Sequence, residues 1–367
     1  MPEGPEVYMN GQLVNKVCKG RFFDGKIVKS AVSKSCEITF SSPKYTITSE
    51  TRGKEMGLKL QCEENKDNKL RIIFRFGMSG HFKFSPVSEE VKHAHLSFFT
   101  QDEPKMALHF VDVRRFGSWE PCDGWGPDRG PDPMFEYDSF RANVLDNSGN
   151  KLFNKPICEV LLEQKYFNGV GNYLRSEIMY RAKVPPFTCA RTVLEEVKDG
   201  SKSPDFLKLC HDVPKEVINL GTGKNYDLTA SGEDHEDFDK WLQCYNQSDM
   251  DSMADGKKRM VWFKGDPGPM APTDAKKKPA AKAKGKASTK PEKSEKTSKT
   301  DTKKQTKKAS SATKDEDKPA KQEDPVKDET DATVEEAATT RPKRGKRKAT
   351  IADKEQEETK SKRSRKK

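Results

Sequence analysis

The sequence predicts an α+β protein in which an N-terminal helix and an antiparallel β-sandwich precede a helical domain and a basic tail. Two changes of hydrophobic period support this order. The apolar residues follow a helical period in residues 2–21, a period of two until about residue 120, and a helical period again from 136 to about 245. The third observation is compositional, because residues 275–367 hold 31 Lys and Arg against 17 Asp and Glu and no aromatic residue.

The N-terminal helix is expected over residues 2–21, where Val7, Leu13 and Val14 have helical spacing and Gly20 is placed to end it. Short alternating runs follow, separated by turn-forming residues: KEMGLKLQC, KLRIIFRF, HFKFS, HLSFFT and MALHFVDV. Short strands with turns at this spacing are typical of a β-sandwich. We therefore expect a first domain, with the helix and the sandwich, over residues 1–125.

A segment rich in Gly, Pro and Asp, CDGWGPDRGPDP, follows the strands and predicts an interdomain linker at residues 126–135. The runs ICEVLLEQ, LRSEIMYRA and FDKWLQCY then indicate a helical domain over residues 136–250. The last aromatic run, KKRMVWFKGDPGP, predicts a short strand that ends in a turn, within residues 251–273.

The tail, residues 274–367, is expected to be disordered because it has too little apolar surface to offset the loss of chain entropy. From residue 275 onward its net charge is +14, whereas the preceding 274 residues carry 38 Lys and Arg against 41 Asp and Glu. Its clusters RPKRGKRK (341–348) and KSKRSRKK (360–367) are typical of nuclear-localisation signals or of sites that bind a polyanion. The alternative is a tail that only keeps the chain soluble.

The eight cysteines include no C-x-x-C pair, which disfavours a zinc ribbon or a thioredoxin-like site. No cluster of Cys, His and carboxylate residues indicates a metal ion. No secretory signal and no transmembrane stretch is recognisable, so we expect a reduced intracellular compartment and no membrane partner.

The segment YFNGVGNYLRSEIMY can be interpreted as a phosphate-binding helix start or as a structural turn without a ligand. Gly169 and Gly171 allow a tight turn, and Asn172 is a natural N-cap for the helix that follows. Free N–H groups at such a helix start suit a phosphate. The alternative is an ordinary corner between two helices.

Two further segments place large or charged residues at the ends of strands. In VDVRRFGSW, Arg114, Arg115 and Phe116 can grip a nucleic-acid backbone and wedge into a base stack. The alternative is a solvated strand end with one buried Phe. In FRFGMSGHF, Met78 lies at a loop tip flanked by glycines, so it is either under-packed or functional. Lys54, in TRGKEM, is by itself an ordinary solvated lysine.

Five motifs stand in the order expected of the formamidopyrimidine-DNA glycosylase/endonuclease VIII family: PEGPE, RGKEM, FRFGMSG, RRFG and FNGVGNYLRSEI. The sequence resembles this family over residues 1–273. The resemblance implies that the sandwich is followed by a helix–two-turns–helix domain and a finger, with DNA between the domains. In one branch a zincless hairpin replaces the zinc finger, and this sequence fits that branch because Cys244 is the last cysteine before the tail.

The resemblance also implies a chemistry for the opening MPEGPE. Removal of the methionine exposes Pro2 as a secondary amine with a pKa of about 8, so that part of it is nucleophilic near neutral pH. Attack at C1′ of a damaged nucleotide expels the base and leaves a Schiff base, a cationic iminium that drives elimination of both phosphates. Glu3 is implied as acid and base, Glu6 as the group that orients the amine, and Lys54 as a general acid. No cofactor is implied.

Other residues are implied to contact DNA. Asn172, Tyr173 and Arg259 belong to the elements that hold the phosphates beside the lesion. Lys224 and Tyr226, in GTGKNYD, fall where this branch has a lesion-contacting loop. A solvated lysine is the alternative for Lys224.

Chemistry on a base inside a duplex requires that the nucleotide be flipped out, which leaves a gap in the stack. Met78, Arg114 and Phe116 match the residues that fill this gap in the family, and Arg115 lies beside them.

The resemblance therefore predicts a bifunctional DNA glycosylase and β,δ-type AP lyase. It would start base excision repair on oxidised bases, mainly pyrimidines and hydantoin or ring-opened lesions. Its partner is damaged DNA, as duplex, bubble or single strand. We expect a nuclear monomer whose tail contacts other repair and replication proteins. The alternative is a non-catalytic damaged-DNA or chromatin-binding protein with the same fold, which the intact PEGPE and Lys54 disfavour.

Overall fold

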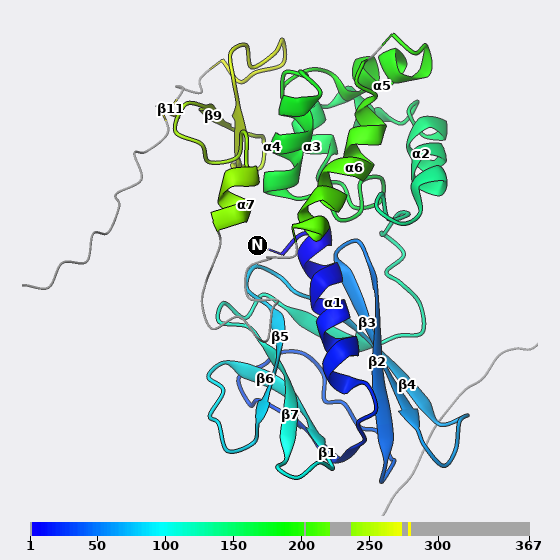
Figure 1. Ribbon diagram of the computed structural model, residues 1–367. Helices are drawn as coiled ribbons and strands as arrows, with labels where there is room; N and C mark the ends of the chain where they lie inside the picture. Colours follow the sequence, from blue (N-terminus) through cyan, green and yellow to red (C-terminus); the bar gives the residue numbers. More distant parts are fainter. Residues whose placement is uncertain (1, 202, 221–235, 274–277, 280–367) are drawn as a thin grey trace, which may run out of the picture. The chain divides into compact units, whose positions relative to one another are not determined.

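The computed structural model describes residues 2–201, 203–220, 236–273 and 278–279 (Figure 1). All of them belong to a compact unit formed by Met1–Thr289, whereas the second unit, Lys290–Lys367, lies outside the described residues. Lys224, Tyr226 and nearly all of the predicted tail also lie outside them.

Helix α1, Gly4–Cys18, agrees with the predicted N-terminal helix. Its buried face includes Val7 and Val14, which pack into the core of the β-sheet. The helix is also joined to strand β2, Tyr45–Arg52, by hydrogen bonds. Asn15 Nδ2 donates to the carbonyl of Ser49 over 2.9 Å, and the N–H of Ser49 donates back to Asn15 Oδ1 over 2.7 Å. The start of the chain is therefore fixed on the sheet.

Eight strands form one antiparallel sheet in the order β5-β7-β6-β1-β2-β3-β4-β8. The strands are β1 Phe23–Lys29, β2 Tyr45–Arg52, β3 Glu55–Cys62, β4 Lys69–Arg75, β5 His81–Pro86, β6 Ala94–Thr100, β7 Met106–Val111 and β8 Ser118–Pro121. The five alternating runs of the sequence correspond to β3 to β7. The sequence analysis missed β1, β2 and β8, which have few large apolar residues in alternation. Strand β1 contains a glycine and three charged residues, β2 is polar after Ile47, and β8 has only four residues.

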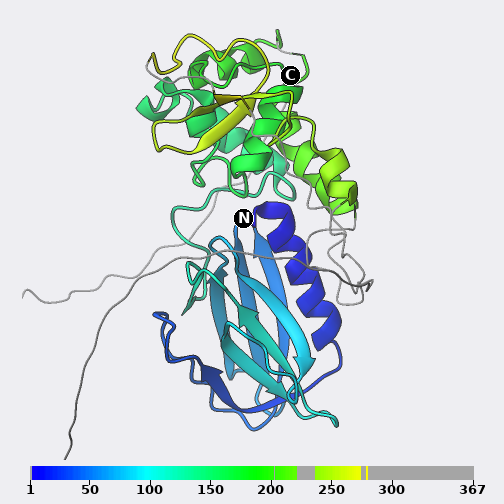
Figure 2. The same cartoon turned by 90° about the vertical axis from the view of Figure 1, so that its left-hand side faces the viewer.

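The sheet is folded over so that strands from its two ends face each other (Figure 2). The ring centroid of Phe74 in β4 lies 4.9 Å from that of Phe82 in β5 and 5.2 Å from that of Phe110 in β7. All three rings are buried. The two layers of the expected sandwich are thus halves of one continuous sheet.

The helical part has its own hydrophobic core, built from residues of every helix between Tyr137 and Asn219. Its elements are α2 Tyr137–Asp146, the 3₁₀ turn η1 Lys151–Asn154, α3 Ile157–Val160, α4 Asn172–Arg181, α5 Ala190–Lys198, α6 Phe206–Asn219 and α7 Glu236–Trp241. Met9 of α1 packs against this core, so α1 contacts both cores. No helix among the described residues is long and apolar enough to span a membrane.

A β-hairpin of β9, Asp251–Ala254, and β10, Met260–Phe263, lies beside α4 (Figure 1). A third strand, Lys278–Pro279 (β11), pairs with β9. These two residues fall in the segment that was expected to have no structure. The pairing uses the edge of β9 that β10 leaves open.

Candidate active site

The carboxylate of Glu3 caps helix α4. Its Oε2 accepts from the N–H groups of Gly171 at 2.6 Å and Leu174 at 3.3 Å, and its Oε1 accepts from that of Tyr173 at 3.0 Å. The N–H of Gly4 donates to the carbonyl of Gly169 over 2.9 Å. A negative charge at a helix N-terminus is stabilised by the unpaired N–H groups there. The first residues of the chain are therefore locked to the turn before α4.

This arrangement depends on the two glycines of the turn. Gly169 has a φ of +97°, and a Cβ atom on Gly171 would lie 2.3 Å from the carboxyl carbon of Glu3. Two expectations from the sequence are corrected. The N-cap of α4 is Gly171, whereas Asn172 is the first helical residue, and the N–H groups expected to hold a phosphate are occupied by Glu3. Sequence reasoning could not predict that Glu3 caps α4, because Glu3 lies 168 residues before Gly171 in the chain.

Glu6 forms a second buried carboxylate beside the first. Its Oε2 accepts from the backbone N–H of Glu3 at 2.8 Å, and its Oε1 accepts from the hydroxyl of Tyr173 at 2.9 Å. Tyr173, expected at the DNA surface, is buried and uses its N–H and its hydroxyl to hold the two carboxylates. The structure thus places Tyr173 with the carboxylates instead of with the phosphate-binding residues.

Burial raises the pKa of Glu3 to about 7, and the neighbouring carboxylate of Glu6 adds to this rise. The positive charge of Lys54 and the N–H groups of α4 act in the opposite direction. Burial also raises the pKa of Glu6. A carboxyl group that is partly protonated at neutral pH can both donate and accept a proton, which is what general acid–base catalysis requires.

Lys54 lies in the two-residue turn between β2 and β3, directly after Gly53, which has a φ of +55°. Its Nζ donates to the carbonyl of Val170, in the loop before α4, over 2.8 Å. Burial lowers the pKa of the Lys54 ammonium, and the charge of Glu3 opposes that shift. Pro2, half-buried, directly precedes Glu3. The four residues expected to carry chemistry, Pro2, Glu3, Glu6 and Lys54, therefore belong to one locality.

The two residues expected to hold phosphates meet where the hairpin adjoins α4. Asn172 Nδ2 donates to the carbonyl of Met260 over 3.0 Å. Arg259 Nε lies 3.2 Å from Asp255 Oδ2, while its Nη2 has no hydrogen-bond partner among the described residues. The charge of Arg259 contributes to the lowered pKa of Lys54, so this guanidinium lies close to the catalytic candidates.

The hairpin is anchored to α4 by buried charges. Arg175 Nη1 donates to Asp255 Oδ2 over 2.8 Å, and both side chains are fully buried. Glu177 accepts backbone N–H groups of Gln243, Cys244 and Tyr245. Sequence reasoning missed these three charged residues, because nothing in a local pattern marks a charged side chain as buried. Among the described residues no group of three His, Cys, Asp or Glu could hold a metal ion.

Met78 and the Arg114–Phe116 segment are brought together on two adjoining loops. A Cβ atom on Gly77, which has a φ of +64°, would lie 2.5 Å from the carbonyl carbon of Phe116. Phe116 is 61% exposed and Met78 is 39% exposed, although both are large and apolar. The Arg114 guanidinium lies 5.5 Å from the Phe116 ring centroid. Exposed apolar residues held on tight loops fit a wedge that acts only when a partner is bound.

One buried carboxylate, Asp112, joins these two loops. It accepts from the hydroxyl of Ser79 on the first loop and from the N–H groups of Arg114 and Gly117 on the second. Beside them lies a hollow of about 620 Å³ whose lining includes Arg114, Arg115 and Phe116. Arg115 adopts a φ of +57°. Sequence reasoning singled out Met78, Arg114 and Phe116 as candidate wedge residues but missed Asp112, which joins their loops.

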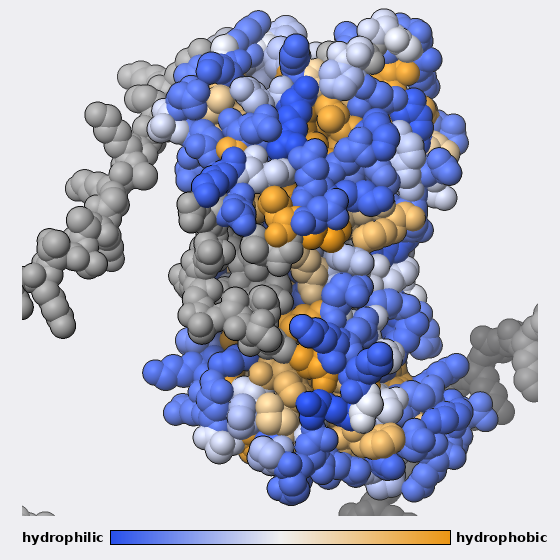
Figure 3. All heavy atoms as spheres, viewed as in Figure 1, coloured by the Kyte–Doolittle hydropathy of each residue, from blue (hydrophilic) through white to orange (hydrophobic). Residues whose placement is uncertain are grey.

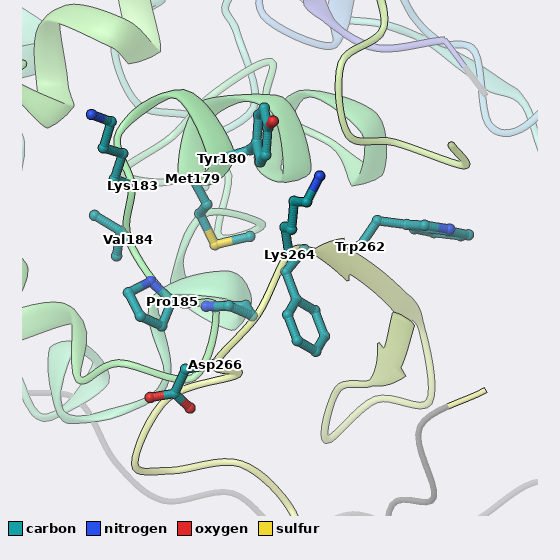
Figure 4. A pocket seen from close by; sticks show the side chains of 10 residues that line it. Met179, Tyr180, Lys183, Val184, Pro185, Trp262, Lys264 and Asp266 are labelled. Carbon is teal, nitrogen blue, oxygen red and sulfur yellow. The ribbon is translucent and has the colours of Figure 1, made fainter. Parts of the chain in front are cut away.

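A second hollow, of about 350 Å³, lies between the end of α4 and the end of β10 (Figure 4). None of the predicted site residues lines it. Its lining combines apolar and aromatic side chains with two lysines: Met179, Tyr180, Lys183, Val184, Pro185, Pro186, Trp262, Phe263, Lys264 and Asp266. On the face drawn in Figure 3, hydrophilic residues cover most of the surface, and apolar residues gather around the start of α1.

Comparison with known protein families gives two matches. Residues 1–119 match the family model described as Formamidopyrimidine-DNA glycosylase N-terminal domain. Residues 234–272 match the one described as Endonuclease VIII-like 1, DNA bind.

Relatives match over most of the chain. Endonuclease 8-like 1 of Mus musculus is 47% identical over 291 residues, which are 74% of this chain and 75% of the relative. Endonuclease 8-like 1 of Homo sapiens is 46% identical over 295 residues, which are 75% of each chain. Formamidopyrimidine-DNA glycosylase of Arabidopsis thaliana is 29% identical over 224 residues, covering 53% of this chain and 54% of the relative.

Solved structures share the fold. The MutM (Fpg) protein of Thermus thermophilus superposes with a TM-score of 0.55 at 20% identity, covering 72% of this chain and all of that one. The Lactococcus lactis formamidopyrimidine-DNA glycosylase bound to AP-site DNA superposes with a TM-score of 0.54 at 22% identity, covering 71% and 97%. The mixed helical and antiparallel-sheet architecture is therefore that of these enzymes.

Proposed function

Since this chain belongs to the formamidopyrimidine-DNA glycosylase/endonuclease VIII family, among the endonuclease 8-like 1 proteins, we propose that Pro2 is the nucleophile with which it acts on damaged DNA. The chain is a DNA glycosylase with AP lyase activity that acts in base excision repair, and it binds DNA. Its nucleophile, substrates and DNA contacts are inferred from the site.

The observation that carries the proposal is the environment of Glu3, next to Pro2. The Glu3 carboxyl is buried, has a pKa of about 7, and is held by three N–H groups of α4 and the turn before it. A protein that only binds DNA gains nothing from two buried carboxylates beside its first residues, since burying them is costly. An enzyme gains a positioned acid and base.

The chemistry then proceeds as follows once Met1 has been removed. The Pro2 nitrogen attacks C1′ of the damaged nucleotide while Glu3, in its protonated form, donates a proton to the sugar ring oxygen. The N–C1′ bond forms, the bond from C1′ to the base breaks, and the base leaves with the bonding electrons. After the nitrogen loses its proton and the ring opens, a cationic iminium remains. Proton removal from C2′ then expels the 3′ phosphate, and a second elimination expels the 5′ phosphate.

The remaining residues hold and distort the DNA. Asn172 and the partly exposed guanidinium of Arg259 would bind phosphates on either side of the lesion, and Lys54 would act at the target nucleotide. We infer that α3 and α4 with the turn between them form the helix–two-turns–helix element, and that β9 and β10 form the zincless finger. Met78, Arg114 and Phe116 would fill the gap left by the flipped nucleotide.

The substrates are inferred from the family resemblance, and the protein partners and the location are inferred from the tail. We propose oxidised pyrimidines and hydantoin or ring-opened bases as lesions, in duplex, bubble or single-stranded DNA. The enzyme would act as a monomer. The Lys- and Arg-rich clusters of the tail support a nuclear location and contacts with other repair and replication proteins.

The test is borohydride trapping. Reduction of the iminium should give a permanent protein–DNA adduct whose mass maps to the N-terminal peptide. A chain with an N-terminal tag has an amide in place of the Pro2 amine and should lose base release and strand cleavage, while the same tag at the C-terminus serves as the control. Lys54→Leu should slow base release but still give the adduct on abasic DNA. An adduct on Lys54, or full activity with a blocked N-terminus, would contradict the mechanism.

A further inference from the structure

We propose that Asp132, in the interdomain linker, is a positioning residue that fixes the Gly53–Lys54 turn and thereby aims Lys54 at the substrate, an inference that rests on the proposed function. Nothing in the local sequence marks Asp132, because GPDP is a common loop pattern. Three consecutive residues, 52 to 54, each make contacts that fix the position of this turn.

The central contact is between Asp132 and the turn. Asp132 Oδ2 accepts from the N–H of Gly53 at 2.7 Å, while its Oδ1 accepts from the N–H of Met134 at 2.7 Å. Only 2% of Asp132 is exposed. A buried carboxylate with both oxygens bound to backbone groups holds those groups at a fixed separation. The linker and the turn are therefore joined immediately before Lys54.

Lys54 is held from its other side by Asn168, which is fully buried. Asn168 Oδ1 accepts from the N–H of Lys54 at 3.4 Å, and Asn168 Nδ2 donates to the carbonyl of Gly130 at 2.8 Å. Gly53 is required here for two reasons. Its φ is +55°, and a Cβ atom on it would lie 2.0 Å from Asn168 Oδ1.

The residue before the turn is fixed by the same segment. Arg52 binds Glu136 through Nε at 2.5 Å and Nη2 at 3.1 Å, and Glu136 Oε2 accepts from the N–H of Asp132 at 2.8 Å. The segment 130–136 therefore holds the end of β2 at Arg52 and the turn at Gly53, and its Gly130 carbonyl accepts from Asn168. Residues 52, 53 and 54 each have a partner outside the sheet.

These contacts matter because a lysine side chain is long and flexible. The position of its ammonium is defined only if the position of its backbone is fixed. The Lys54 ammonium lies 2.8 Å from the carbonyl of Val170, close enough to the Glu3 charge for each to shift the pKa of the other. A displacement of the turn by about 1 Å would take the ammonium out of this arrangement, and errors of that size can cost roughly a hundredfold in rate.

The test is a double-mutant cycle measured as single-turnover base release from the full chain without Met1. Asp132→Ala should slow base release by about tenfold or more. In the Lys54→Leu background the same change should have no further effect, because Asp132 acts through Lys54. Borohydride adduct formation on abasic DNA should stay near the wild-type level in both backgrounds. Asp138→Ala, an exposed acidic residue at the start of α2, is the matched control.

The outcomes separate three cases. An equal additional loss in the Lys54→Leu background, or loss of the adduct in step with a lowered melting temperature, would show that Asp132 only supports the fold. Unchanged base release in a folded Asp132→Ala protein would also overturn the proposal. Asp132→Asn keeps the size and one acceptor, and it replaces Asp132→Ala if the latter does not fold. If Lys54→Leu itself leaves base release intact, the proposed role of Lys54 fails, and the role of Asp132 fails with it.

Discussion

Glu3 combines a structural and a chemical role in one carboxylate. It binds the unpaired N–H groups at the start of α4, beginning 168 residues away in the chain, and it is the acid of the proposed reaction. The sequence alone predicted that the opening MPEGPE is functional. It could not predict the cap, because capping by a residue so distant leaves no periodic or local pattern. Asp112, Asp132, Glu177 and Asp255 were missed for the same reason.

At the residue scale, the raised pKa of Glu3 makes stability depend on pH. Between the ordinary carboxyl value of 4.5 and about 7, the folded chain binds more protons at Glu3 than the unfolded chain. The free energy of unfolding should therefore fall as the pH rises through this window, by at most about 3 kcal/mol from this group. Glu3→Gln removes that part of the decline. Urea unfolding of both proteins at pH 5, 6, 7 and 8 measures it.

The quantity that tests this prediction is the slope of the unfolding free energy against pH. The hydrogen bonds lost in Glu3→Gln lower the free energy of unfolding by the same amount at every pH, so they do not change this slope. The stability of Glu3→Gln relative to wild type should improve as the pH rises. Some decline should remain in the variant, since burial also raises the pKa of Glu6, and that of Asp132 to about 6. Glu90→Gln, at an exposed position, is the control and should follow wild type. Parallel curves for Glu3→Gln and wild type would refute the assignment.

At the scale of elements, the sequence predicted the helices and strands whose apolar residues follow a clear helical or alternating period. The alternating runs became β3 to β7, whereas β1, β2 and β8 have too few large apolar residues in alternation to be recognised. The helix after the glycine turn was found, but its start was misplaced by one residue. The two loops with Met78 and Phe116 were proposed as a wedge through their motifs alone, since neither exposed apolar side chain belongs to a periodic pattern.

The wedge loops also yield a prediction at this scale. Met78→Ala, Arg114→Ala and Phe116→Ala should slow base release from duplex DNA more than from single-stranded DNA with the same lesion, because only a duplex leaves a gap to fill. Exposure of Met78 and Phe116 means that these changes should cost little stability. Asp112→Ala should give the same selectivity, because Asp112 joins the two loops.

Single-turnover rates on the two substrates decide this prediction, with melting temperatures measured in parallel. Val87→Ala, which removes an exposed apolar side chain from the turn after β5, is the matched control. Equal slowing on both substrates would show that the loops act through general stability and would remove them from the wedge.

At the scale of the whole molecule, α1 joins what the sequence presents as two separate domains. Its Val7 and Val14 pack in the core of the sheet, and its Met9 packs against the core of the helical part. The hydrophobic pattern predicted two regions with cores, and the segment predicted as their linker, residues 126–135, lies between β8 and α2. The sequence did not predict that this segment and the first residues of the chain would together surround the proposed catalytic residues, since that depends on contacts between distant segments.

The last prediction concerns charge at this scale. Residues 1–274 carry a formal net charge of −3, whereas residues 275–367 carry +14. Each phosphate that a protein neutralises adds about 0.9 to the slope of log affinity against log salt concentration. Deleting residues 275–367 should therefore lower that slope and weaken DNA binding at low salt. The site residues all precede the deletion, so single-turnover base release at saturating enzyme should stay nearly unchanged. The same truncated chain, fused to a fluorescent protein, should lose its nuclear enrichment. As a control, replacing the two clusters 341–348 and 360–367 with neutral residues at full length should reproduce both effects in part. Equal salt slopes with and without the tail, or loss of base release on truncation, would show that the tail is not an electrostatic accessory to DNA binding.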